Sequence, residues 1–189
     1  MCGISREADI EAVNELKPDY IGFVFFEKSH RHVDPKQAER LKASLASGIK
    51  VAGVFVDADP DLVVDLFESG IIDLAQLHGD EDEDYIASLH DHHIPVIKAF
   101  RVRSEDDLVN AKSSGADYIM LDAGMGEGKR FDWNLLKSFD RPYFLAGGLD
   151  AFNAAVLGAT VHGMAGDILA REGVDGVLAS EIADALRKV

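Results

Sequence analysis

The chain has 189 residues, of which 47% are hydrophobic and 28% charged, and its formal net charge is −15. These values predict one globular domain over residues 1–189, and the negative charge argues against a nucleic-acid partner or an anionic membrane surface. No apolar run reaches the roughly 20 residues of a membrane helix, and the N-terminus lacks the layout of a signal peptide, so we expect a cytoplasmic protein.

Near-continuous apolar runs alternate with amphipathic stretches along the whole chain. Such runs predict strands that are covered on both faces. The clear runs lie at residues 20–26, 50–56, 72–77, 96–100, 118–121 and 143–146. We also predict a strand stub at Met1-Cys2 and a weak strand at 164–168.

The stretches between these runs carry helix signals. Pro35 and the pair Asp59-Pro60 are typical first-turn residues, and Ser104 begins a sequence that resembles a capping box. Together with apolar spacing, these signals predict helices at residues 10–16, 35–41, 60–67, 83–89, 104–112, 134–138 and 181–188.

Strands that alternate with helices predict a parallel α/β architecture. The repeat of about 25 residues and the eight units favour a (β/α)8 TIM barrel, with a first strand that is truncated. An open, doubly wound sheet is the main rival, because periodicity does not report closure. In a barrel the C-terminal ends of all strands open onto one face, where the active site lies.

Two acid–base candidates sit at predicted strand ends. Cys2 is the lone cysteine, so it forms no internal disulfide, and a thiol activated by its site can act as a nucleophile or general base. Its alternative role is a small buried side chain. Asp122 directly follows four apolar residues, a costly place for a carboxylate unless it is hydrogen-bonded. Its alternative role is a helix cap or a turn former.

Other polar and glycine positions at strand ends suggest ligand contacts. The pair Gly147-Gly148 follows the strand at 143–146, where backbone N–H groups can approach a phosphate, although a tight turn is the simpler interpretation. Arg31 is a candidate clamp for an anionic group, or a surface arginine. Either Gln76 or His78 is expected to point into the mouth of the barrel.

Taken together, these segments closely resemble the phosphoribosylanthranilate isomerase family. The shared motifs run in the family's order over nearly all of residues 1–153. They are C-G-I-S-R at 2–6, G-F-V-F at 22–25, S-H-R-H-V at 29–33, G-V-F-V at 53–56, Q-L-H-G-D-E at 76–81, L-D at 121–122, G-K-R-F-D-W at 128–133 and L-A-G-G-L at 145–149, with Asn153.

The resemblance implies a cofactor-free Amadori rearrangement in tryptophan biosynthesis. N-(5-phosphoribosyl)anthranilate would become 1-(2-carboxyphenylamino)-1-deoxyribulose 5-phosphate. By position, Asp122 matches the general acid that opens the furanose ring. Cys2 matches the general base that removes the C2 proton, a role that suits a thiol at neutral pH if its site lowers the thiol pKa. Arg31 matches the residue that contacts the anthranilate carboxylate.

The resemblance also implies the remaining site residues and the partners. Gly147 and Gly148 match phosphate binders, and Asp167 aligns with an aspartate at the mouth of the active site. We expect no metal, no cofactor, a small-molecule substrate, and either a monomer or a homodimer.

Two departures from the family pattern keep a second function open. Only Met1 precedes Cys2, which predicts an open sheet edge and a thiol on a fraying terminus. After Asp167 the family's serine pair is missing, and Arg171 is the candidate replacement at the phosphate. These changes suggest, as the alternative, a barrel that binds a sugar phosphate without efficient turnover. An isomerase of a related histidine-pathway substrate ranks lower, because the Arg31 loop has no paired glycines for a second phosphate.

Overall fold

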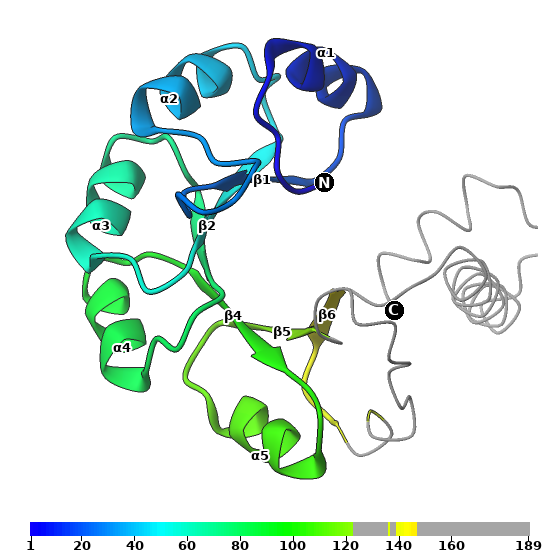
Figure 1. Ribbon diagram of the computed structural model, residues 1–189, viewed down its shortest axis with the longest axis vertical. Helices are drawn as coiled ribbons and strands as arrows, with labels where there is room; N and C mark the ends of the chain where they lie inside the picture. The colour runs from blue at the N-terminus through cyan, green and yellow to red at the C-terminus, as the bar shows by residue number, and fades with distance from the viewer. Residues whose placement is uncertain (123–135, 137–138, 147–189) are drawn as a thin grey trace, which may run out of the picture. The chain divides into compact units, whose positions relative to one another are not determined.

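The computed structural model describes residues 1–122, 136 and 139–146. Figure 1 shows strands alternating with helices through this part of the chain. The strands are β1 (Tyr20–Val24), β2 (Lys50–Phe55), β3 (Leu74–Leu77), β4 (Val96–Arg101), β5 (Tyr118–Asp122) and β6 (Tyr143–Ala146). The helices are α1 (Glu7–Leu16), α2 (Pro35–Ala43), α3 (Pro60–Glu68), α4 (Glu83–Asp91) and α5 (Glu105–Ser113).

The six clear strands predicted from the sequence are confirmed, and their ends shift by at most two residues. The helices predicted up to residue 112 are confirmed as well. The predicted elements at 164–168 and 181–188 lie outside the described residues, as does nearly all of 134–138.

The six strands form one sheet in which every neighbouring pair is parallel and the spatial order follows the chain, β1-β2-β3-β4-β5-β6. A doubly wound sheet reverses its order part-way and carries helices on both faces. No reversal occurs among these strands, and the five helices lie along one side of the sheet (Figure 1). The doubly wound alternative is therefore excluded for the described part of the chain.

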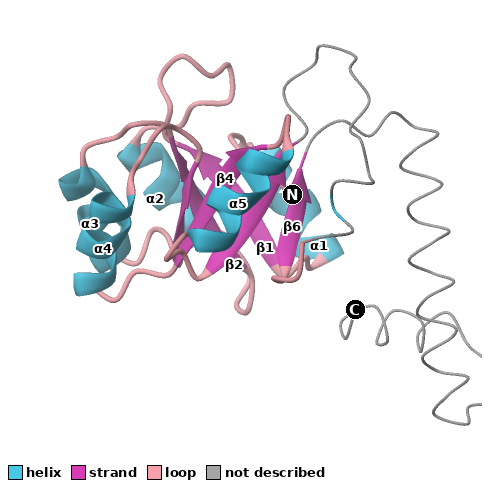
Figure 2. Ribbon diagram, turned by 90° about the horizontal axis from the view of Figure 1, so that it is seen from below, coloured by secondary structure: helices cyan, strands magenta, loops and turns pink. Residues whose placement is uncertain are grey.

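The sheet buries side chains on both faces, as the continuous apolar runs predicted. The face toward the helices packs into a large core that includes Ile21, Phe23, Val51 and Leu121, and Figure 2 shows this helix layer against the strands. The opposite face holds a smaller cluster of Ala52, Leu74 and Ile97, with Tyr20 and Met120 packed against it. None of the described helices is long and apolar enough to cross a membrane.

Side-chain caps explain where several helices begin. The Asp34 carboxylate accepts a hydrogen bond from the backbone N–H of Gln37 at 2.8 Å, and that of Asp59 accepts one from Asp61 at 3.0 Å. Each of these caps directly precedes a proline, which suits the first helical position because its missing N–H has no partner there. The helix starts predicted from Pro35 and Pro60 are confirmed.

The N-terminus is tied to β1 by backbone hydrogen bonds. Cys2 forms a parallel bridge with Gly22, whose N–H donates to the Met1 carbonyl at 2.8 Å. The N–H groups of Gly3 and Ile4 both donate to the Gly22 carbonyl, at 3.0 and 3.1 Å. The predicted stub is thus present beside β1. The expectation of a fraying terminus is wrong, because these bonds anchor the chain on both sides of Cys2.

We expect Phe55→Ala to lower the free energy of unfolding by about 3–5 kcal/mol, since a large buried ring leaves a cavity. Phe55 is fully buried, and its ring stacks on Phe25 at a centroid distance of 5.2 Å. The matched control is Val109→Ala on α5, where the side chain is 61% exposed and we expect a change within about 0.5 kcal/mol. Urea denaturation of both variants measures the difference, and equal losses would contradict the prediction.

Candidate active site

A buried carboxylate and an imidazole meet at the C-terminal edge of the sheet. Asp122 is the last residue of β5 and only 5% exposed. His78 directly follows β3, and its Nε2 lies 3.2 Å from Asp122 Oδ2. The structure therefore brings together two of the residues that the sequence singled out, although 44 positions separate them along the chain.

Gln76 extends this contact into a chain of three side chains. Its buried amide Nε2 lies 3.5 Å from His78 Nδ1. An amide nitrogen can only donate, so Nδ1 is the acceptor there. When the imidazole is neutral, its proton then sits on Nε2 and is donated to Asp122. The prediction that Gln76 or His78 points into the site is consistent with this chain, in which both take part.

Two glycines make room for the side chains of Cys2 and Arg31. A Cβ on Gly22 would lie 2.7 Å from Cys2 Sγ, so any side chain there would displace the thiol. Gly3 has φ +82, a conformation that favours glycine, and a Cβ on it would overlap the side chain of Arg31. In the resulting space the Arg31 guanidinium donates to the Cys2 carbonyl at 3.3 Å. Arg31 and Cys2 therefore belong to one corner of the site.

Burial raises the pKa of the Cys2 thiol above its ordinary value, even though part of the residue is exposed. The positive N-terminus, the backbone N–H of Gly3 and the Arg31 charge all act in the opposite direction, but together they are weaker. The condition that the site lower this pKa is therefore not met in the free protein. Burying the thiolate charge costs more free energy here than the attraction of the neighbouring positive charges restores.

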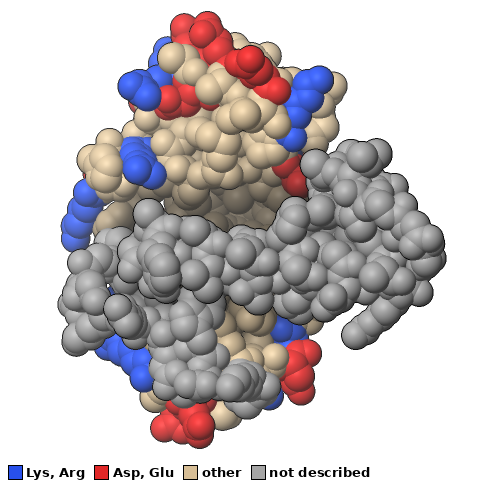
Figure 3. Space-filling model, turned by 90° about the vertical axis from the view of Figure 1, so that its right-hand side faces the viewer, with Lys and Arg blue, Asp and Glu red and all other residues tan. Residues whose placement is uncertain are grey.

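A cavity of about 400 Å³ lies beside the thiol and extends to Pro18 and Tyr20, where β1 begins. Cys2 lines it together with Gln76, and Met120 and Phe144 contribute apolar walls. Figure 3 shows uncharged, tan surface in the hollowed part of this face that the described residues form. The arrangement suits a ligand with an apolar ring whose polar groups meet Cys2 and Gln76.

Four predicted site residues lie outside the described residues: Asp167, Gly147, Gly148 and Arg171. Their roles stay predictions. Within the described part of the chain, no group of three or more His, Cys, Asp or Glu side chains could hold a metal ion.

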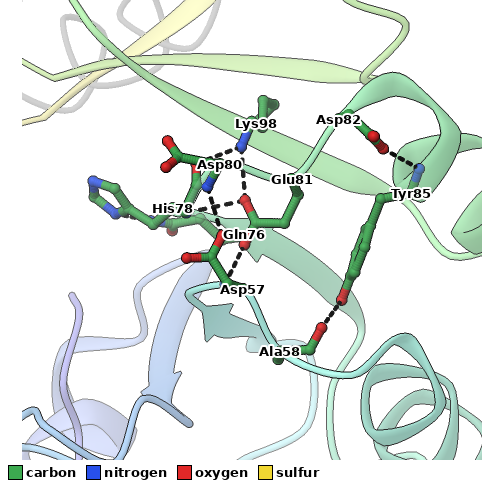
Figure 4. Close-up of polar contacts among 10 residues, drawn as sticks. Asp57, Ala58, Gln76, His78, Asp80, Glu81, Asp82, Tyr85 and Lys98 are labelled. Atoms are coloured by element: carbon green, nitrogen blue, oxygen red, sulfur yellow. Dashed lines mark hydrogen bonds and ion pairs between the residues drawn. The ribbon is translucent and has the colours of Figure 1, made fainter.

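The sequence interpretation missed a polar network beside His78 (Figure 4). Glu81 and Lys98 form a buried ion pair with a separation of 2.7 Å between Nζ and Oε2. One signal was present in the sequence: Lys98 interrupts the apolar run of β4, and a buried lysine needs a partner. Nothing in the sequence identified that partner as Glu81.

Comparison with known proteins identifies the family to which this chain belongs. The model of the family described as N-(5'phosphoribosyl)anthranilate (PRA) isomerase matches residues 1–168. The chain belongs to the phosphoribosylanthranilate isomerase family. The N-(5'-phosphoribosyl)anthranilate isomerase of Endomicrobium trichonymphae is 44% identical over 161 residues, which cover 82% of this chain and 78% of that protein.

Solved structures of phosphoribosylanthranilate isomerases agree in fold. That of the Thermus thermophilus enzyme has a TM-score of 0.72 at 30% identity, covering 84% of this chain and 80% of the other. A second isomerase was solved in complex with reduced 1-(o-carboxyphenylamino)-1-deoxyribulose 5-phosphate. It has a TM-score of 0.66 at 30% identity and covers 82% of this chain and 77% of the other.

For this member of the isomerase family, we predict that Cys2 alkylates with a pH midpoint above that of a free cysteine. Its raised pKa means that less thiolate is present at neutral pH, and thiolate is the reactive form. Cys2 is the sole cysteine, so iodoacetamide labelling followed by mass spectrometry reports on it alone. The urea-unfolded chain is the control, and a folded midpoint at or below the unfolded one would contradict the prediction.

We also predict that neutral His78 carries its proton on Nε2. Nitrogen-15 NMR of imidazole-labelled protein at about pH 8, above the usual histidine pKa, separates the two tautomers by their chemical shifts. The spectrum of His78→Asn assigns the signal. A proton found on Nδ1 would mean that Asp122 receives no hydrogen bond from this ring.

Proposed function

We propose that the protein catalyses the isomerisation of N-(5-phosphoribosyl)anthranilate to 1-(2-carboxyphenylamino)-1-deoxyribulose 5-phosphate, a step of tryptophan biosynthesis. The observation that carries the proposal is the buried Asp122 at the end of β5, held by His78 at 3.2 Å in a chain of this family. A carboxyl group buried at the mouth of a parallel sheet is suited to deliver a proton to a bound sugar.

In the first step, the Asp122 carboxyl group protonates the furanose ring oxygen. The bond between C1 and that oxygen breaks, and the lone pair of the anthranilate nitrogen forms the C=N bond of a protonated Schiff base. His78 stabilises the carboxylate that remains, because its Nε2 lies 3.2 Å from Oδ2 and, in the predicted tautomer, donates to it.

In the second step, the Cys2 thiolate takes the proton from C2. The electron pair of the C2–H bond forms the C1=C2 double bond, and the C=N pair returns to nitrogen, which gives an enolamine. Tautomerisation then adds a proton at C1 and removes one from the C2 hydroxyl, leaving the ketone. The raised pKa of Cys2 makes its conjugate thiolate a strong base once formed.

The substrate contacts follow from the same assignment. We assign the anthranilate carboxylate to Arg31, whose guanidinium lies beside Cys2. The sugar is assigned to Gln76 and His78, whose side chains lie beside Asp122. The phosphate is assigned to Gly147 and Gly148 with Arg171, and Asp167 to the mouth, as predicted from the sequence.

The proposal includes closure of the sheet into a (β/α)8 barrel formed by one domain over residues 1–189. Three features support it: strand order that follows the chain, helices on one face, and a bridge from Cys2 to the free edge of β1. The enzyme would act in the cytoplasm without a cofactor, as a monomer or a homodimer.

The test is turnover of N-(5-phosphoribosyl)anthranilate, followed by the loss of its anthranilate fluorescence. We expect Asp122→Asn and Cys2→Ala each to lower kcat by roughly 10²–10⁴-fold, with smaller effects on KM, because each removes a proton-transfer group.

Asp117→Asn is the matched control, since Asp117 precedes the same strand at its opposite edge and its carboxylate binds the N–H of Val96. We expect its kcat to stay close to that of the unchanged protein. Product binding without turnover in the unchanged protein would overturn the proposal in favour of a binding barrel.

A further inference from the structure

Glu81 and Lys98 form an ion pair that is almost completely removed from water. Lys98 projects from β4 and Glu81 from the loop between β3 and α4, with side chains 7% and 1% exposed. Removing two charges from water costs several kcal/mol per ion, and their attraction often only offsets that cost. A gain in stability is thus a weak explanation for this buried ion pair. The hydrogen bonds that it makes to the surrounding loop indicate a second role.

The ion pair forms hydrogen bonds with both backbone polar groups of Gly79, its carbonyl and its N–H. Lys98 Nζ donates to the Gly79 carbonyl at 2.8 Å, and the Gly79 N–H donates to Glu81 Oε2 at 3.0 Å (Figure 4). A Cβ on Gly79 would overlap the carboxylate of Asp57, so only glycine lets the two loops approach this closely. The peptide that follows His78 is therefore fixed by the ion pair.

The same network connects the loop after β3 to the loop after β2. Glu81 Oε1 accepts the N–H of Asp57 at 2.9 Å, and Asp57 Oδ1 accepts the N–H of Asp80 at 2.7 Å. Asp57 adopts φ +49, a conformation that non-glycine residues rarely take and that these bonds sustain. Together they make the two loops one rigid unit at the catalytic edge of the sheet.

His78 lies between these anchors. Its own N–H donates to the Phe55 carbonyl at 2.9 Å, and the next residue is the one that the ion pair holds. The backbone is thus fixed on both sides of the side chain that reaches Asp122 at 3.2 Å. A shift of about 1 Å in a positioning group can lower a rate 100-fold.

We propose that Glu81 and Lys98 are positioning residues: their ion pair fixes the loop that carries His78, and His78 in turn holds the Asp122 carboxyl group in the orientation for proton donation. This inference rests on the proposed isomerase activity. Their hydrogen bonds lead to Asp122 through the backbone of Gly79 and the side chain of His78.

A second ion pair provides the matched control. Lys42 Nζ lies 2.7 Å from Asp73 Oδ2, and the same oxygen accepts the N–H of Val51 at 2.7 Å. This pair joins α2 to the loop before β3, and Asp73 also ties that loop to β2, but it lies where β2 and β3 begin, at the opposite edge of the sheet. Its side chains are 26% and 39% exposed, so it controls for the loss of an ion pair away from the catalytic edge, while Lys98→Arg controls for the loss of the buried charge.

The experiment compares Lys98→Met, Lys98→Arg, Glu81→Gln and Lys42→Met in the full chain. We expect Lys98→Met and Glu81→Gln to lower kcat roughly 10- to 100-fold while KM changes little, because ground-state contacts to the substrate remain. Lys98→Arg keeps the charge and the donors, so it retains a higher kcat than Lys98→Met. Lys42→Met leaves kcat near that of the unchanged protein.

Nitrogen-15 NMR of the His78 ring gives a readout that does not depend on turnover. We expect the Nε2–H tautomer in the unchanged protein and in Lys42→Met, and a mixture of tautomers in Lys98→Met. If the unchanged protein shows no turnover, the proposed function fails, while the ring signal still decides whether the ion pair positions His78.

Three results would overturn the inference. One is an unchanged kcat in folded Lys98→Met, and another is an equal loss in Lys42→Met. The third is an unaltered His78 signal in the Lys98 variant. If Lys98→Met does not fold, Gly79→Ala takes its place, since it disturbs the same loop without leaving a buried charge.

Discussion

The structure depends on one constraint: every strand of the sheet runs in the same direction and in chain order. Each described connection from β1 to β5 therefore returns through a helix, and these helices gather on one face. All strand C-termini then lie at one edge, where short loops present side chains from distant parts of the sequence. His78 and Asp122 meet there although β4 lies between the strands that carry them.

Glycines and a buried ion pair determine how closely the loops and side chains pack at this edge of the sheet. Gly22 and Gly3 leave room for the thiol and for Arg31, and Gly79 lets two loops touch. The side chains of Glu81 and Lys98 are almost fully buried, and this favours the hydrogen bonds that they make to Gly79. In the proposed arrangement, these residues position the site without contacting the reacting atoms.

The acid and base candidates sit in unlike surroundings, as acid–base catalysis requires. Asp122 is buried at the end of β5 and receives a hydrogen bond from His78, whereas Cys2 is held at the edge of β1 beside the N-terminal charge. Burial dominates at the thiol and raises its pKa despite the cations around it. Two groups in separate environments can hold different protonation states at one pH.

The sequence by itself determined the strands, the helix starts and the family, because apolar runs, proline positions and motif order are local properties. It also placed Asp122 and His78 at strand ends. Only the tertiary structure decided that these two residues touch, that Cys2 is anchored rather than frayed, and that Lys98 pairs with Glu81. Those outcomes depend on strand register, loop packing and burial, which arise from contacts between segments far apart in the chain.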